Sequence, residues 1–212
     1  MSKRTAYTLA GIFLFILLLT GVYCAATWQT KKIEQLERQI TFLKEEFVPI
    51  RFKILERQND SILVSFKFYD LDMHKVSYTD KNGKSKNYVR MKLPGNELAI
   101  DFLVVPVGNK YVAFPYKVMT DAIKPKDGII LFDYYDKNNF PQIYYSQYST
   151  PAFNSGMKAL FIKIKKGEIE DIKGIFGSMV QDINNLKQFD VGQVYKVVVH
   201  PAKGGIEIIR ED

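Results

Sequence analysis

Cysteine and histidine are scarce in this sequence, and that scarcity excludes several kinds of site. The chain has one cysteine, Cys24, and two histidines, His74 and His200. A zinc site needs three or four His, Cys, Asp or Glu ligands, so we expect no metal centre and no cofactor. A single cysteine cannot form an internal disulfide, which leaves the redox compartment open.

Motifs of enzymatic chemistry are also missing. No G-x-S-x-G nucleophile turn occurs in the sequence. Gly204-Gly205 precedes a predicted strand, whereas a phosphate-binding loop opens onto a helix. Residues 80–83 (DKNG) begin like a calcium loop, but the glycine comes at the fourth position instead of the sixth. We therefore predict a protein that is not an enzyme.

Two features could still carry catalysis. His200 ends an apolar stretch just before Pro201, where we interpret it as a structural residue, although an enzyme using His200 is kept as an alternative. Asp70 and Asp72 share one side of a strand if the strand continues. We interpret them as the solvated end of that strand and not as a catalytic carboxylate pair.

Charged residues are absent from residues 5–30, and this absence predicts a membrane anchor. About 20 apolar helical residues span the roughly 30 Å of bilayer hydrocarbon. Tyr7, Tyr23 and Trp28 lie near the ends of the segment, where aromatic rings favour the interface. The anchor is predicted to centre on Ile12, Phe13, Leu14, Phe15, Ile16, Leu17, Leu18 and Leu19.

Two other interpretations of this segment are open. A signal peptide could be cleaved after Ala26, although its apolar core is normally shorter than this one. Lipidation at Cys24 would require a small residue before it, and Tyr23 is large. We favour an uncleaved signal anchor in the inner membrane, with the basic tail 1–4 in the cytoplasm and the large domain in the periplasm.

Residues 31–48 have a heptad pattern that predicts a short coiled-coil stalk. Apolar residues recur at alternating spacings of three and four, the a and d positions of a parallel two-stranded coil. The predicted oligomer interface consists of Ile33, Leu36, Ile40, Leu43 and Phe47. Pro49 should end the helix. The pattern predicts a homodimer, and the alternative is a single amphipathic helix that lies on its own domain.

Beyond residue 49 the hydrophobic period changes to two, which predicts a single β-rich domain over 49–212. Hairpins are expected for 52–56 with 62–69, 75–79 with 87–93, 97–105 with 110–114, 128–135 with 142–148, and 193–200 with 205–210. Other expected elements are a helical turn within 115–126, a strand at 158–165 and an amphipathic helix at 168–189. The fold class is α+β, mostly β: an antiparallel sandwich or half-barrel with one packed helix.

Two surfaces could bind a partner. Tyr134, Tyr135, Tyr144 and Tyr145 crowd one predicted hairpin, where some rings would be exposed unless the sheet is covered on both sides. Lys163 and Lys165 alternate with apolar residues in the strand predicted at 158–165 and would form a basic face.

The layout favours a non-enzymatic, single-pass scaffold that presents its domain to a bacterial cell-envelope assembly with unidentified protein partners. The alternative is a module that binds an envelope polymer or lipid through the tyrosines and lysines. The net charge of +7 suits anionic surroundings. We expect no nucleic-acid partner unless the domain faces the cytoplasm.

Overall fold

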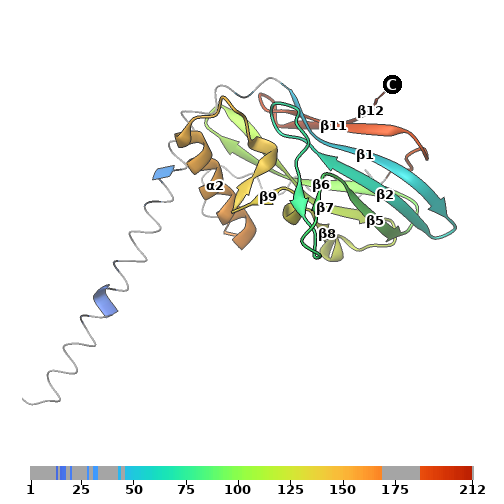
Figure 1. Ribbon diagram of the computed structural model, residues 1–212, viewed down its shortest axis with the longest axis horizontal. Helices are drawn as coiled ribbons and strands as arrows, with labels where there is room; N and C mark the ends of the chain where they lie inside the picture. The colour runs from blue at the N-terminus through green and yellow to red at the C-terminus, as the bar shows by residue number, and fades with distance from the viewer. Residues whose placement is uncertain are drawn as a thin grey trace, which may run out of the picture.

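The computed structural model describes residues 46–168 and 187–211, together with a few positions between 13 and 43. These residues form a mostly β domain of antiparallel sheets, as the sequence predicts (Figure 1). The larger sheet has the strand order β12-β11-β1-β2-β5. Its strands are β1 (Phe47–Gln58), β2 (Ser61–Phe68), β5 (Val89–Pro94), β11 (Val194–His200) and β12 (Gly205–Glu211).

The smaller sheet, β6-β7-β8, and several short elements complete the domain. The sheet contains β6 (Leu98–Val107), β7 (Lys110–Thr120) and β8 (Ile129–Ile130). Two-residue strands pair as β3 (Tyr78–Thr79) with β4 (Ser85–Lys86) and as β9 (Asp136–Lys137) with β10 (Phe140–Pro141). The helical elements are η2 (Pro125–Asp127), η3 (Phe132–Tyr134), η4 (Gln142–Tyr144) and α2 (Pro151–Lys166).

One hydrophobic core joins both sheets and α2 in a sandwich-like arrangement. Burial alternates along β2 and β5, so each strand turns one side to the core and the other to solvent. A chain of rings crosses the core: Phe47 and Tyr144 have centroids 5.3 Å apart, Tyr144 and Phe114 5.4 Å, and Phe114 and Phe161 5.7 Å. These contacts connect β1, η4, β7 and α2.

Three of the predicted hairpins are confirmed. They join β1 to β2, β6 to β7 and β11 to β12. Gly108 has φ 57° between β6 and β7, a conformation that glycine adopts at no steric cost. The turn at 80–83 is also confirmed and contains Gly83 at φ 74°. However, the long strand after it, β5, pairs with β2 instead of with residues 75–79.

The strand predicted at 158–165 is wrong, because these residues belong to α2. Thr150 caps the helix by accepting a hydrogen bond from the backbone N–H of Phe153, and Pro151 stands at its first position. Gly167 ends it in the left-handed conformation. Phe153, Met157, Leu160 and Ile164 recur at helical spacing and are buried. The apolar residues and lysines of 158–165 fit a strand period of two and a helix period of 3.6 equally well. The capping residues Thr150, Pro151 and Gly167 favour the helix.

Two further predictions fail around the middle of the chain. Residues 128–135 and 142–148 do not form the predicted pair of strands: η3 and η4 lie within them, and the short pair of β9 with β10 forms between them. Asn138 and Asn139, with φ 55° and 64°, make the tight turn between the two short strands. The helical turn expected within 115–126 is strand in its first half, because β7 continues to Thr120, and a single helical turn, η2, begins only at Pro125.

The predicted stalk helix is wrong at its end, because Phe47 and Val48 belong to β1. Phe47 pairs with Val199 of β11, and Leu43 is buried in the domain core at 3% exposure. Ile33, Leu36 and Ile40 lie outside the described residues. So do residues 169–186 of the predicted helix at 168–189, while Lys187 already forms a bridge to Leu98.

The predicted membrane anchor is described at only a few positions. Phe13, Phe15, Ile16 and Leu17 have helical backbone and side chains that are more than half exposed. Ile12, Leu14, Leu18 and Leu19 lie outside the described residues. Among the residues that are described, no helix is both long and apolar enough to cross a bilayer.

Candidate functional site

The predicted tyrosine surface is wrong for two of its four rings. Tyr135 and Tyr144 are fully buried, and their hydroxyls donate to the carbonyls of Pro115 and Ala113 at 2.7 and 2.9 Å. Burial raises the pKa of both phenols far above the ordinary value. These tyrosines therefore attach η3 and η4 to β7 and are closed to a ligand.

The other two predicted tyrosines differ from each other. Tyr134 is half-buried, stacked on Phe68 with centroids 6.3 Å apart and edge-on to Tyr78 at 5.1 Å. Burial raises the pKa of Tyr134 above the ordinary value. Tyr145 is 45% exposed, so it alone of the four presents much of its ring to solvent.

Lys163 and Lys165 lie near the end of α2 and do not form the predicted strand face. The Lys165 ammonium donates to Asp136 at 2.5 Å and to Asn139 at 2.6 Å, which ties α2 to the β9–β10 turn. Basic residues in the last turn of a helix also interact favourably with its dipole. We therefore assign Lys165 a structural role.

The two carboxylates considered for catalysis, Asp70 and Asp72, accept hydrogen bonds from loop residues. Asp70 is buried, and its carboxylate accepts the backbone N–H of Asp72 and of His74. Asp72 accepts the Ser146 hydroxyl at 3.0 Å and the Gln147 N–H at 2.8 Å. The predicted solvated strand end is thus wrong, because both carboxylates satisfy loop donors instead.

His200 lies between two exposed glutamates, with Nδ1 3.2 Å from Glu46 and Nε2 3.6 Å from Glu207. This arrangement fits a structural tie between β11, β12 and the start of β1. No group of three or more metal-ligating side chains gathers anywhere in residues 46–168 or 187–211.

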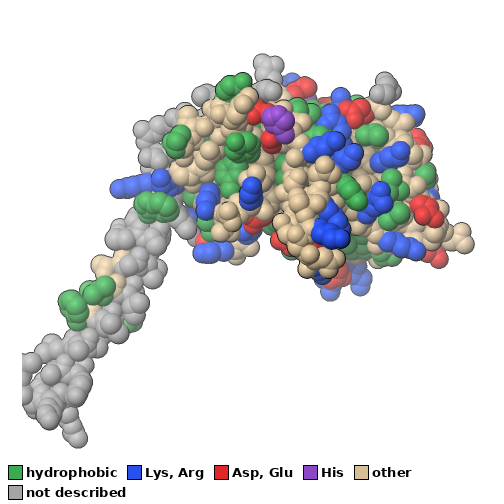
Figure 2. Space-filling model, in the orientation of Figure 1, with side chains coloured by type: hydrophobic (Ala, Val, Ile, Leu, Met, Phe, Trp, Pro, Cys, Tyr) green, Lys and Arg blue, Asp and Glu red, His purple; other side chains and the backbone are tan. Residues whose placement is uncertain are grey.

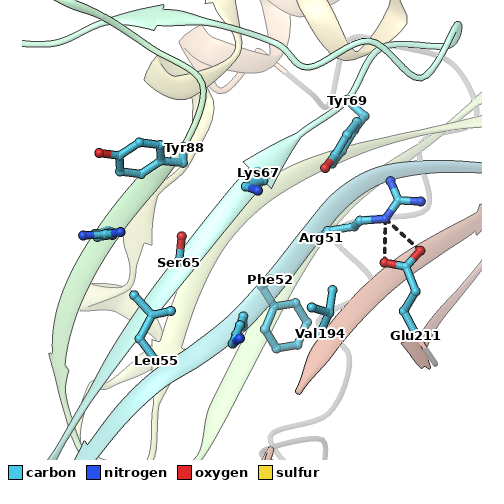
Figure 3. A pocket seen from close by; sticks show the side chains of 11 residues that line it. Arg51, Phe52, Leu55, Ser65, Lys67, Tyr69, Tyr88, Val194 and Glu211 are labelled. Atoms are coloured by element: carbon cyan, nitrogen blue, oxygen red, sulfur yellow. Dashed lines mark hydrogen bonds and ion pairs between the residues drawn. The ribbon is translucent and has the colours of Figure 1, made fainter. Parts of the chain in front are cut away.

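The strongest candidate site is a groove of about 520 Å³ on the outer face of the larger sheet (Figure 3). Its basic side chains come from β1, β2 and β5, and Glu211 of β12 is the acidic residue among those that line it. Figure 2 shows lysines and arginines gathered over the part of the domain where Figure 1 places these strands. We call this the cationic groove; it is lined by Arg51, Phe52, Lys53, Leu55, Ser65, Lys67, Tyr69, Tyr88, Arg90, Val194 and Glu211.

The strand register places basic residues side by side. Arg51 lies directly opposite Lys67 on one neighbouring strand and opposite Lys196 on the other. In the next row Lys53 pairs with Ser65, which in turn pairs with Arg90. Like charges directly opposite each other in a sheet are destabilising. Three cations in one row therefore cost stability that an anionic ligand would recover.

Both arginines of the groove are held in place by aromatic rings. The Arg51 guanidinium lies 4.6 Å from the Tyr69 ring centre, and that of Arg90 lies 5.0 Å from the Tyr88 ring centre. Arg51 Nε also donates to both carboxylate oxygens of Glu211 at 2.9 Å (Figure 3). Fixed guanidinium groups lose little side-chain entropy when they bind an anion.

The cationic groove is not among the surfaces predicted from the sequence, although the sequence contains part of its signal. Basic residues alternate with buried ones in Arg51-Phe52-Lys53, Phe66-Lys67-Phe68 and Arg90-Met91-Lys92, so each strand has a basic outer side. The pairing of β2 with β5 brings these sides together, and that pairing was predicted wrongly.

Comparison with known proteins gives no assignment for the groove, because no family model, no curated protein and no solved structure matches the chain.

Proposed function

We propose that this protein is a membrane-tethered, non-enzymatic interaction protein that binds an anionic partner of a cell-envelope assembly through the cationic groove. One observation carries the proposal: Arg51, Lys53, Lys67 and Arg90 share the groove with Glu211 as their acidic neighbour. The protein would then be both a scaffold and a binding module. Its binding surface would lie on the larger sheet and not on the hairpin of tyrosines predicted from the sequence.

Electrostatics support binding over a purely structural role for these residues. Arg51, Lys67 and Lys196 lie in one row, an arrangement of like charges that by itself destabilises a sheet. A concentrated positive field, by contrast, attracts anionic partners and speeds their association. Because Tyr69 and Tyr88 hold the arginines, the groove is also preorganised.

The tether is proposed from the charge-free segment 5–30 and from its described side chains. Apolar groups at 54–68% exposure on Phe13, Phe15, Ile16 and Leu17 would be unfavourable in water and favourable in lipid. Trp28 is 61% exposed, and the Lys32 ammonium lies 5.1 Å from its ring, a pair suited to the headgroup region. We propose that the β-rich domain is periplasmic.

We propose that the protein dimerises through fewer stalk residues than the five that the heptad pattern predicts. Leu43 and Phe47 pack in the domain core, so Ile33, Leu36 and Ile40 are left to form a coil. Such a coil is shorter than the three to four heptads that define a coiled coil, and membrane tethering would have to assist it.

Retention on immobilised heparin, a generic polyanion, tests the groove. The double variant Lys53→Gln/Lys67→Gln should elute at lower salt than the unmodified protein. Lys81→Gln/Lys84→Gln, in the exposed turn between β3 and β4, makes the same change in net charge and should elute at unchanged salt. Equal shifts for the two pairs would show that net charge alone binds heparin and would overturn the proposal.

The tether has its own test in cells. A C-terminal tag should be cleaved by protease once the outer barrier is permeabilised, and the protein should stay in the membrane fraction after alkaline extraction. A tag that survives until the inner membrane is lysed would place the domain in the cytoplasm instead.

A further inference from the structure

The geometry of the cationic groove points to one ligand class: we infer that it binds a phosphodiester polymer without nucleobases, such as a chain of glycerol phosphate units. The inference rests on the proposed function and specifies the chemistry of its anionic partner. Three features of the groove carry it, namely the spacing of the cations, the use of the backbone and the covering of the aromatic rings.

The cations repeat at intervals that suit a polymer. Arg51 and Lys53 are two residues apart on one strand, a rise of about 6.6 Å, and neighbouring strands lie about 4.8 Å apart. Arg90 lies two strands from Lys53 in the same row, since both pair with Ser65. A ligand with a negative group every few ångströms can therefore contact several cations at once. A single small anion would contact fewer.

The backbone of the groove argues against an acidic peptide. β1 and β2 are interior strands, each paired on both sides, so the sheet itself uses their N–H and C=O groups. A peptide lying on this face would have its own N–H and C=O groups met by side chains only, and buried backbone groups need partners. The backbone of a phosphodiester chain has no N–H groups; its phosphate oxygens accept hydrogen bonds from lysine and arginine, and the glycerol hydroxyls can bond to water.

The aromatic rings argue against single-stranded nucleic acid. Such ligands are bound by stacking bases on open aromatic faces. The Tyr69 ring is buried with the Arg51 guanidinium over it, and Arg90 covers a face of Tyr88. Tyr88 is 38% exposed, so one ring of the groove is partly open, whereas Phe52 is buried and Leu55, Ser65 and Val194 have no ring. The groove thus supplies several cations but no series of open rings on which successive bases could stack.

Glu211 takes the place of one ligand phosphate in the free protein. Its carboxylate receives both hydrogen bonds from Arg51 Nε, so the terminal Nη groups of Arg51 are not used by this ion pair. A phosphate that enters the groove competes with Glu211 for Arg51. Removing the carboxylate should therefore strengthen binding, while removing lysines should weaken it.

Fluorescence polarisation with three labelled probes of equal charge number tests the inference: a glycerol phosphate oligomer, oligothymidylate and poly-L-glutamate. The glycerol phosphate oligomer should bind tightest. Lys53→Gln/Lys67→Gln should weaken its binding about tenfold, the Lys81→Gln/Lys84→Gln control should leave it unchanged, and Glu211→Gln should tighten it severalfold. Near-ultraviolet circular dichroism shows that each variant is folded.

The outcomes separate the inference from the proposed function. If oligothymidylate or poly-L-glutamate binds as tightly and depends on the same two lysines, the groove binds anions but the ligand class is wrong. If the groove pair and the control pair weaken binding of every probe equally, or neither does, then both the inference and the proposed function fail.

Discussion

The Tyr144 hydroxyl accepts a hydrogen bond from the backbone N–H of Ala113 at 2.7 Å and donates one to the Ala113 carbonyl at 2.9 Å. One buried side chain thus satisfies both backbone groups of a β7 residue, as a neighbouring strand would. Tyr144→Phe leaves both groups without this partner and should lower the free energy of unfolding by about 1–3 kcal/mol.

Urea denaturation of the Tyr144→Phe variant measures this loss. Tyr148→Phe provides the control, because Tyr148 is 77% exposed and its change should be within about 0.5 kcal/mol. Equal small effects for the two variants would mean that the buried Ala113 groups find other partners.

Gly95 and Gly83 both have positive φ, yet only one of them is crowded. A Cβ on Gly95 would lie 2.2 Å from the Asp121 carboxylate, which accepts the backbone N–H of Asn96 and of Glu97. A Cβ on Gly83 meets nothing within 4 Å. Gly83→Ala should cost about 1–2 kcal/mol for conformation alone, and Gly95→Ala about 2–4 kcal/mol. The difference between the melting temperatures of the two variants measures the extra cost of the clash with Asp121. Equal losses of stability in Gly83→Ala and Gly95→Ala would argue against that clash.

Asp101 makes stability depend on pH in an unusual direction. Its side chain is buried on β6, one carboxylate oxygen has no hydrogen-bond partner, and desolvation raises its pKa above 3.8. The folded state therefore binds this proton more tightly than the unfolded chain does. The contribution of Asp101 to stability falls as pH rises from 3.8 through the raised pKa.

Asp101→Asn should thus stabilise the protein near neutral pH, where the wild-type carboxylate is charged, and lose that advantage in acid. Thermal melts of both proteins between about pH 3 and pH 7 measure the difference, which follows the titration of this one group. A difference between the two proteins that stays constant over this range would exclude Asp101 as the cause.

Lys67 separates binding from stability. Because it lies opposite Arg51, Lys67→Gln should raise the free energy of unfolding by about 0.2–1 kcal/mol at low salt, and less at high salt. The same variant should bind polyanions more weakly. Lys84→Gln, in an exposed turn, should change neither property. A loss of both stability and binding in Lys67→Gln would indicate that the lysine supports the fold instead.

Local patterns in the sequence determined much of the sheet structure. Strands β1, β2, β6, β7, β11 and β12 coincide with stretches that the sequence predicts as strands, and Gly108 and Gly204 at positive φ lie in the turns between β6 and β7 and between β11 and β12. These features depend on near neighbours in the chain, so the residues alone reveal them. The scarcity of cysteine and histidine likewise limited the kinds of site to expect.

Only the tertiary structure decided which face of the protein is a candidate site. Arg51 and Lys67 belong to a hairpin that the sequence predicts, but Arg90 joins them only because β5 pairs with the other side of β2. The four tyrosines were considered as one possible binding surface, and the tertiary structure buries Tyr135 and Tyr144, since a ring in a short irregular segment obeys no period that sets its direction. Leu43 and Phe47 fit a heptad as well as they fit a core, and contacts with distant residues select the core. Strand order and burial depend on long-range packing, which local sequence periods do not specify.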